Sequence, residues 1–269
     1  MARSSRRSRN SGAAVRRSAP GGVLLKTPGE IDAMAAAGAL LARCHLAVEE
    51  AVSAGVTTGH LDEIAEAFIR DNGAIPAFKG YSGFPGSICP SVNEEVVHAI
   101  PGPRALNDGD ILSLDMGLIL DGWVADQART LAIGPISDEA RMLMAATEAS
   151  LADGIAAIRP DGRVGDISAA VQKRIEDAGF HVVEALVGHG VGRSMHEPPQ
   201  VPNFGRAGTG APLTVGTVIA IEPMVNVGTP DIRMADDGWT ISSADGGLSA
   251  HFEHTVAVTA SGPRILTLV

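Results

Sequence analysis

The segment DILSLDMGLILDGWVADQARTLAIG, residues 110–134, sets two aspartates into apolar runs that otherwise have the pattern of buried strands. An Asp-Gly pair, Asp121-Gly122, separates the two runs. Such a pair between apolar runs is a strong short-range signal for a two-residue hairpin turn. The segment therefore predicts a long antiparallel hairpin that carries Asp115 and Asp126.

The register of this hairpin decides how the two carboxylates lie. With a two-residue turn, Asp115 lies opposite Ala128 and Asp126 lies opposite Gly117, so the aspartates are diagonal neighbours on one face. Diagonal positions lie about 7–8 Å apart, close enough for both carboxylates to reach shared metal ions. Because a buried carboxylate without a partner is costly, the hairpin predicts a cation site. The alternative, a side chain that points to solvent, is expected for Asp121.

Helix signals precede the hairpin. Thr27, Pro28 and Glu30 form a capping-box start for a long alanine-rich helix, which we expect to end near Gly55. The stretch GHLDEIAEAFIRDNG, residues 59–73, has apolar residues at helical spacing and ends in a glycine, so it predicts a second helix.

The second part of the chain repeats this arrangement. Ser137 caps another long helix, and GDISAAVQKRIEDAG, residues 165–179, has the glycine-to-glycine spacing of residues 59–73. The run LTVGTVIAIE ends in Glu222 as LNDGDILSLD ends in Asp115, so we expect each strand to end at its acid. The pattern indicates two similar halves, each with helices followed by strands, although chance could also produce such a likeness.

Further candidate ligands follow. His189 lies between two glycines, Glu222 comes at the end of an apolar strand, and Glu253 begins another strand. Each alone also fits a structural role, as a satisfied polar residue or a strand-end cap. With Asp115 and Asp126 they form an oxygen-rich set without thiolates, which suits a dinuclear site of Mn, Fe, Co or Zn rather than a structural zinc.

The motifs SVNEEVVHAIPG, SLDMG, VADQART, GHGVGRSMHEPPQVPN, AIEPMVN and SAHFEHTVAVT stand in this order between residues 91 and 259. In order and separation the series resembles the type I methionine aminopeptidases, and the resemblance covers residues 23–269. It implies the pita-bread fold, an α+β fold with two pseudo-symmetric α/β halves around a central curved antiparallel sheet. It also implies a dinuclear metallo-exopeptidase that removes an N-terminal methionine when the second residue is small.

The resemblance also implies roles for individual residues. The metal ligands would be Asp115, Asp126, His189, Glu222 and Glu253. Glu222 would also act as the general base, His196 would donate to the carbonyl oxygen, and His98 would hold the peptide nitrogen next to the scissile bond. The pocket for the methionine side chain would be formed by Tyr81, Phe84, Cys89 and Trp239. Phe84 departs from the family pattern, in which tyrosine is common there.

Other readings stay open on the sequence alone. Proline-specific aminopeptidases and dipeptidases share the implied fold and ligand types, although their chains are usually longer. A catalytically inactive ribosome-binding module of the same fold is a further alternative, disfavoured because every ligand type is present. The remaining histidines are expected to have structural roles: His45, His60, His181, His251 and His254.

Charge and composition separate an N-terminal arm from the body. Residues 1–22 hold six arginines and no acid, in a chain with 21 basic and 31 acidic residues, so residues 23–269 are strongly acidic. The arm is expected to be disordered. It suits docking on a polyanion such as ribosomal RNA, although a solubilising segment, a mis-assigned start or a transit peptide would have a similar composition.

Composition also indicates the cell compartment of the protein. The cysteines, Cys44 and Cys89, do not form a disulfide framework, which favours a reducing cytosol. We find no secretory signal and expect no apolar run of the roughly 18 residues that a membrane span needs. The sequence therefore predicts a cytoplasmic enzyme that contacts neither membranes nor specific nucleic-acid sequences.

Overall fold

The computed structural model describes residues 18–269. Its helices are α1 (Pro28–Glu49), α2 (Thr58–Asp71), α3 (Asp138–Ala156) and α4 (Val164–Asp177), with 3-10 turns at Pro20–Gly22 and Tyr81–Gly83. The strands of the first part are β1 (Ile75–Pro76), β2 (Ile88–Val92), β3 (Glu95–Val97), β4 (Ile111–Leu120) and β5 (Trp123–Ala132). Those of the second part are β6 (His181–Val182), β7 (Gly188–Gly190), β8 (Glu197–Val201), β9 (Val218–Ile221), β10 (Met224–Asn226), β11 (Ile232–Met234), β12 (Ile241–Ser243), β13 (Ser249–His251), β14 (His254–Thr259) and β15 (Gly262–Ile265).

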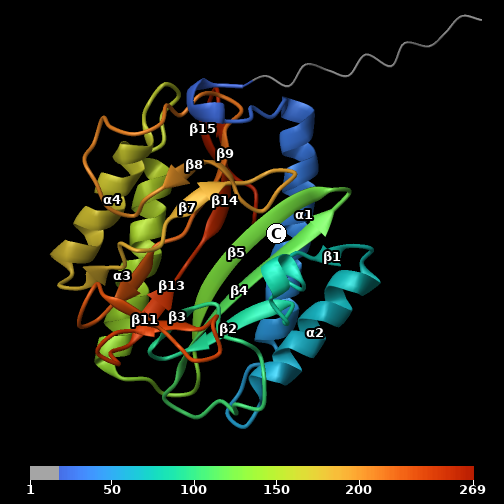
Figure 1. Cartoon of the computed structure of the whole chain (residues 1–269), viewed down its shortest axis with the longest axis vertical. Helices are drawn as coiled ribbons and strands as arrows, with labels where there is room; N and C mark the ends of the chain where they lie inside the picture. Colours follow the sequence, from blue (N-terminus) through green and yellow to red (C-terminus); the bar gives the residue numbers. More distant parts are fainter. Residues whose placement is uncertain (1–17) are drawn as a thin grey trace, which may run out of the picture.

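The elements form two halves with the strands between two pairs of helices. Figure 1 shows α1 and α2 on one side of the strands and α3 and α4 on the other. One sheet holds β1, β4 and β2 with β5 on β4, and the largest has the order β15-β14-β9-β7-β8. Every ladder between these strands is antiparallel. The predicted fold class is confirmed, with the central sheet divided into several hydrogen-bonded parts.

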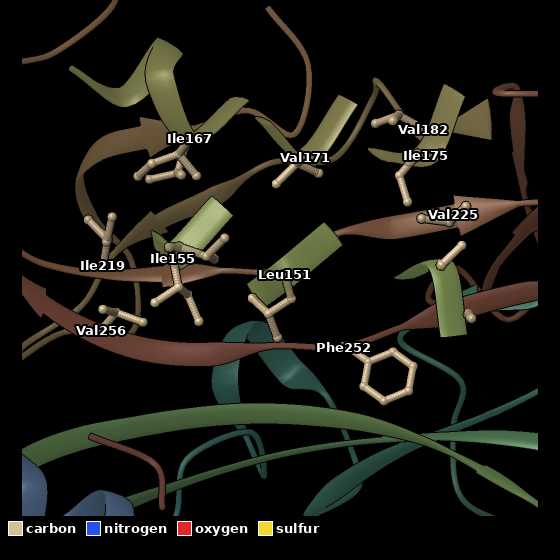
Figure 2. Close-up of a cluster of buried hydrophobic side chains, with 14 of the residues drawn as sticks. Leu151, Ile155, Ile167, Val171, Ile175, Val182, Ile219, Val225, Phe252 and Val256 are labelled. Atoms are coloured by element: carbon tan, nitrogen blue, oxygen red, sulfur yellow. The ribbon is translucent and has the colours of Figure 1, made fainter. Parts of the chain in front are cut away.

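Each half buries its own apolar cluster. In the second half, side chains from α3 and α4 meet side chains from the strands (Figure 2), with Ile155 of α3 beside Ile219 and Val256. In the first half, α1 packs against β4 and β5, and α2 packs against α1, β1 and β2. Full burial of one such side chain contributes about 1.5–3 kcal/mol to the stability of the fold. Each cluster therefore holds the strands of its half against the helices.

Helix α1 begins as predicted and ends earlier than predicted. The backbone amide of Thr27 donates to the Glu30 carboxylate at 2.8 Å, and the Glu30 amide donates to the Thr27 hydroxyl at 3.3 Å. The expected end near Gly55 is wrong, because the helix stops at Glu49. The Gly55 amide donates instead to the Leu106 carbonyl at 2.8 Å, so this segment pairs with a distant loop.

The expectation about apolar segments also needs correction. Helix α1 is long and apolar enough to cross a membrane, by length and composition alone, with a mean hydropathy of 1.4. However, 56% of that window is buried inside the protein. Leu41, Cys44 and Val48 lie in the core of the first half, and α1 contacts β4, β5 and α2. The apolar composition of α1 is therefore explained by packing.

The predicted hairpin is confirmed in its turn and in its register. Asp121 and Gly122 both have positive φ, 50° and 74°, as a type I′ turn requires. Asp115 pairs with Ala128 and Gly117 pairs with Asp126. The expectation that the strand ends at Asp115 is wrong, because β4 continues to Leu120. Both aspartates thus lie within a long twisted hairpin that runs along the middle of the molecule (Figure 1).

Threonine hydroxyls join the halves beside this hairpin. The Thr255 hydroxyl donates to the Asp126 carbonyl at 2.8 Å and accepts from the Asp126 amide at 3.2 Å. The Thr130 hydroxyl does the same for His251, donating to its carbonyl at 2.8 Å and accepting from its amide at 2.9 Å. This junction fixes β5 of the first half against residues 251–255 of the second half.

The predicted N-terminal arm lies mostly outside the described residues. Residues 1–17 are not part of the description, so the disorder expected for them stays a prediction. The remaining residues of the arm, 18–22, include the turn Pro20–Gly22, which contacts β8. Ser18 also forms an antiparallel bridge with Leu24.

Candidate metal centre and substrate pocket

A cavity of about 270 Å³ lies between the halves. All the residues that the sequence analysis placed in the site line it: Tyr81, Phe84, Cys89, His98, Asp115, Asp126, His189, His196, Glu222, Trp239 and Glu253. The lining also includes residues that the sequence analysis did not place there: Phe78, Ser82, Val97, Leu186, Val187, Met195, Met224 and His251. Residues far apart in the chain thus form one concave site, the usual form of a small-ligand site.

One part of the cavity is a cluster of acids around one imidazole. His189 Nε2 lies 3.5 Å from Glu222 Oε1 and 3.8 Å from Asp126 Oδ2. Ligand atoms of Asp126, His189 and Glu253 lie within 4.8 Å of one another. This spacing lets one ion bind several of these atoms together.

The imidazole of His189 is oriented for metal binding. Its Nδ1 lies 2.9 Å from the Gly190 carbonyl oxygen, which can only accept, so Nδ1 carries the proton. Nε2 therefore turns a lone pair toward the acids. Burial, followed by the nearby His196, lowers the pKa of His189 to about 4 and keeps the ring neutral. A neutral imidazole with its second nitrogen held by a carbonyl is the form in which histidine usually binds a metal.

The protein alone does not offset the free-energy cost of burying these carboxylates. Burial raises the pKa of Asp126 to about 7. Burial first, and then repulsion from Asp126, raises the pKa values of Asp115 and Glu253 well above the ordinary range. Among residues 18–269, Asp115 Oδ1, Asp126 Oδ1 and Glu253 Oε1 have no hydrogen-bond partner. Divalent cations would remove the repulsion and occupy these oxygens, so the donor set fits such ions.

We therefore predict that the metal-free protein loses stability as the pH rises. Between the ordinary pKa of Asp126, 3.8, and its raised value of about 7, the folded state keeps a proton that the unfolded state has lost. This contribution is complete at low pH and disappears as the pH rises through about 7. The chelator-treated protein should melt at a lower temperature at about pH 8 than at about pH 6. Asp126→Asn should reduce the difference, and an opposite trend would contradict the prediction.

Histidines border the acid cluster. The Tyr81 hydroxyl lies 2.8 Å from His196 Nδ1, and the rings of His196 and His189 have centroids 4.2 Å apart. With the hydroxyl as donor, Nδ1 accepts and Nε2 of His196 carries the proton. His98 has a positive φ of 60°, which is uncommon outside glycine. Such strain often marks a side chain that is held for function.

Another part of the cavity is apolar and edged by aromatic rings. Phe84 and Trp239 pack edge to face with centroids 5.2 Å apart. Phe84 and Cys89 are buried, Trp239 is half-buried, and Tyr81 is exposed at the rim. Burial, followed by Asp115 and Asp126, raises the pKa of the Cys89 thiol well above its usual range, so Cys89 is a neutral apolar wall.

The glycines around His189 allow close strand packing. A Cβ on Gly190 would overlap the Pro198 carbonyl oxygen of β8, and a Cβ on Gly188 would overlap the Ala220 carbonyl oxygen of β9. Strand β7 therefore fits between β8 and β9 only with glycine at both places. Gly190 consequently fixes the strand that carries His189, which explains the sequence pattern Gly-His-Gly.

A buried ion pair supports the loop that carries His196. Lys26 Nζ lies 2.7 Å from Glu197 Oε2, and both side chains are about 5% exposed. The other oxygen, Glu197 Oε1, accepts from the amide of Arg193 at 2.9 Å. Sequence reasoning missed this pair, because nothing in the chain signals a contact between residues so far apart.

His251, for which the sequence predicts a structural role, lines the cavity. The local pattern could have placed it there, because His251 precedes the candidate ligand Glu253 by two residues and residues at this spacing in extended chain point to the same side. By contrast, His60 and His181 are exposed outside the cavity. The buried His45 donates from Nε2 to the Gln127 carbonyl oxygen at 3.0 Å.

Comparison with known proteins agrees with this geometry. The sequence pattern of metallopeptidase family M24 matches residues 32–260. The methionine aminopeptidase of Clostridium perfringens is 51% identical over 247 residues, which cover 92% of this chain and 99% of that one. The methionine aminopeptidase structure from Thermotoga maritima superimposes with a TM-score of 0.90 at 40% identity, covering 92% of this chain and 100% of that one.

A more distant structure shares the fold alone. The prolidase from Pyrococcus horikoshii has a TM-score of 0.73 at 19% identity, covering 90% of this chain and 63% of that one. The longer prolidase chain agrees with the length difference noted from the sequence. Because a relative more than half identical aligns along nearly its whole length, the chain belongs to metallopeptidase family M24 and, within it, to the methionine aminopeptidases.

Proposed function

We propose that this chain removes the N-terminal methionine from nascent proteins and peptides when the second residue is small. One observation carries the proposal: a single cavity joins the acid-and-imidazole cluster to an apolar, aromatic-edged slot. The cluster suits hydrolysis and the slot suits an unbranched thioether side chain, which adapts to irregular apolar sites and makes favourable sulfur contacts with aromatic rings. The methionine aminopeptidases among the relatives support the same activity.

We propose that the cluster holds two divalent ions, which could be Co, Mn, Fe or Zn. The ligands would be Asp115, Asp126, His189, Glu222 and Glu253. Oxygen and imidazole donors suit any of these metals, and the unpartnered carboxylate oxygens supply coordination sites. When bound, such ions polarise a carbonyl group and lower the pKa of water, so that a nucleophile is available near neutral pH.

Glu222 would be the general base. It follows β9 directly and lies at the wall of the cavity beside His189. In the metal-free protein, burial, followed by repulsion from Asp126 and Asp115, raises the pKa of Glu222 well above the ordinary range. In this role Glu222 takes a proton from the attacking water and delivers it to the departing amine. The same carboxylate thus serves both proton transfers.

His196 and His98 would bind the substrate peptide bond. With Nδ1 of His196 occupied by the Tyr81 hydroxyl, its Nε2 proton is free to donate to the carbonyl oxygen as negative charge develops. A donor of this kind typically contributes about 3 kcal/mol at the transition state. His98 would hold the peptide nitrogen next to the scissile bond. Tyr81, Phe84, Cys89 and Trp239 would enclose the methionine side chain.

The alternatives have less support. A proline-specific peptidase of the same fold is related to this chain by fold alone. An inactive ribosome-binding module would not need the buried, mutually repelling carboxylates, which are costly without bound ions.

A peptide panel tests the activity. We predict that chelator-stripped protein with added Mn or Co releases methionine from Met-Ala-Ser and fails to cleave Met-Leu-Ser and Ala-Pro-Ser, with products followed by mass spectrometry. Without metal, no peptide should be cleaved. Release of alanine from Ala-Pro-Ser would instead assign the protein to the proline-specific group, and no cleavage with any metal would favour the inactive module.

We also propose a cytoplasmic location and a ribosomal partner for residues 1–22. Their six arginines, with no acid among them, suit the phosphates of ribosomal RNA, whereas the acidic body does not. We predict that deletion of residues 2–17 abolishes cosedimentation with ribosomes and leaves cleavage of Met-Ala-Ser unchanged. Full-length protein that fails to sediment with ribosomes even at low salt would refute the proposal and favour a solubilising role.

A further inference from the structure

His251 is a buried imidazole on the cavity wall that the proposed mechanism does not use. Its exposed fraction is 1%, and it lines the cavity. It ends β13 and pairs with Met224 of β10, which lines the cavity as well. Its backbone amide and carbonyl are both held by the Thr130 hydroxyl. The position of His251 is therefore fixed from two sides.

The ring of His251 has unused hydrogen-bonding capacity. Within the described part of the chain, neither Nδ1 nor Nε2 has a hydrogen-bond partner. An imidazole always carries at least one N–H donor, and a buried donor without an acceptor costs free energy. The partner of this donor is therefore expected among the molecules that enter the cavity.

The surroundings of His251 select the kind of acceptor. Met224 and Val97 on the neighbouring cavity wall are apolar, and the Cys89 thiol already interacts with the His98 backbone amide. His98 is a polar neighbour of His251, and the remaining wall suits a substrate side chain that is largely hydrocarbon. Among side chains of this shape, methionine alone also offers a weak acceptor, its thioether sulfur.

We propose that His251 is a specificity-determining residue that donates an N–H group to the sulfur of the substrate's methionine side chain. This inference rests on the proposed aminopeptidase function. Shape and burial alone do not separate methionine from norleucine, which has a methylene group in place of sulfur. A donor aimed at the sulfur does separate them, because norleucine leaves the donor unpaired.

The test is the ratio of kcat/KM for Met-Ala-Ser to that for norleucyl-Ala-Ser. The unmodified enzyme should prefer methionine by about five-fold, the effect of one weak hydrogen bond. His251→Leu, which has similar bulk and no donor, should bring the ratio close to one, mainly through KM for the methionine peptide. His251→Gln, which restores an N–H donor, should recover part of the preference and serves if the leucine variant does not fold.

The control makes the same substitution outside the cavity. His181→Leu alters an exposed histidine of β6 and should keep the unmodified ratio. Equal cleavage of both peptides by the unmodified enzyme, or an unchanged ratio in His251→Leu, would overturn the role of His251 while leaving the peptidase activity in place. Cleavage of neither peptide by the metal-loaded unmodified enzyme would instead refute the proposed function.

Discussion

Glu222→Gln is expected to lower kcat for Met-Ala-Ser by at least about a thousand-fold, because it removes the proposed general base. Glutamine keeps the volume and one oxygen of glutamate but cannot accept a proton. In the protein, Glu222 has a raised pKa, caused by burial and then by Asp126 and Asp115.

The loss must be separated from a loss of metal. Calorimetric titration of Glu222→Gln with Mn measures whether the remaining ligands still bind it, and the kinetic assay is made at saturating metal. Glu184→Gln, which neutralises an exposed acid outside the cavity, serves as the matched control and should keep full activity. A variant Glu222→Gln that binds metal and retains the normal rate would remove Glu222 from the mechanism.

Gly190→Ala is expected to destabilise the protein by about 3 kcal/mol, the upper part of the usual range for overpacking. The added Cβ would overlap the Pro198 carbonyl oxygen, a backbone atom that has little freedom to move. Relief requires β7 and β8 to separate, which displaces His189 next to the substitution. Metal affinity should therefore fall together with stability. Urea unfolding and Mn titration measure the two effects.

Gly29→Ala provides the matched control for this substitution. Gly29 lies in the first turn of α1, and a Cβ there would meet no atom within 4 Å. Alanine is a better helix former than glycine, so stability should stay the same or rise slightly. An equal, small effect of both substitutions would show that β7 tolerates a side chain at Gly190 and that the Gly-His-Gly pattern has another cause.

The sequence predicts best what short-range rules decide. The hairpin register followed from the turn pair Asp121-Gly122 and from strand alternation, and the structure has that register. The start of α1 followed from local capping by Thr27 and Glu30. The end of α1 was mispredicted: the chain leaves the helix in tight turns, Ala51 to Val48 and Val52 to Glu49, and Gly55 beyond them pairs with the distant Leu106. No local pattern contains that information.

The same difference between local and long-range information applies to the site. The residues placed by the family resemblance all line one cavity. By contrast, the contact between Lys26 and Glu197 depends on how two remote segments pack, so sequence reasoning could not find it. His251 is an intermediate case, because its spacing from Glu253 was visible but its burial without a partner was not.

The division of the donor set between the halves has a consequence for how the protein is made. Asp115 and Asp126 belong to the β4–β5 hairpin, whereas the remaining donors come later in the chain, with Glu253 last. Because translation runs from the N-terminus, a growing chain displays the two aspartates of this hairpin before the later candidate donors exist. A translation product that stops before Glu253 therefore carries the first two acids without a complete centre. If the proposed ligand set holds the ions, metal loading awaits synthesis and docking of the second half.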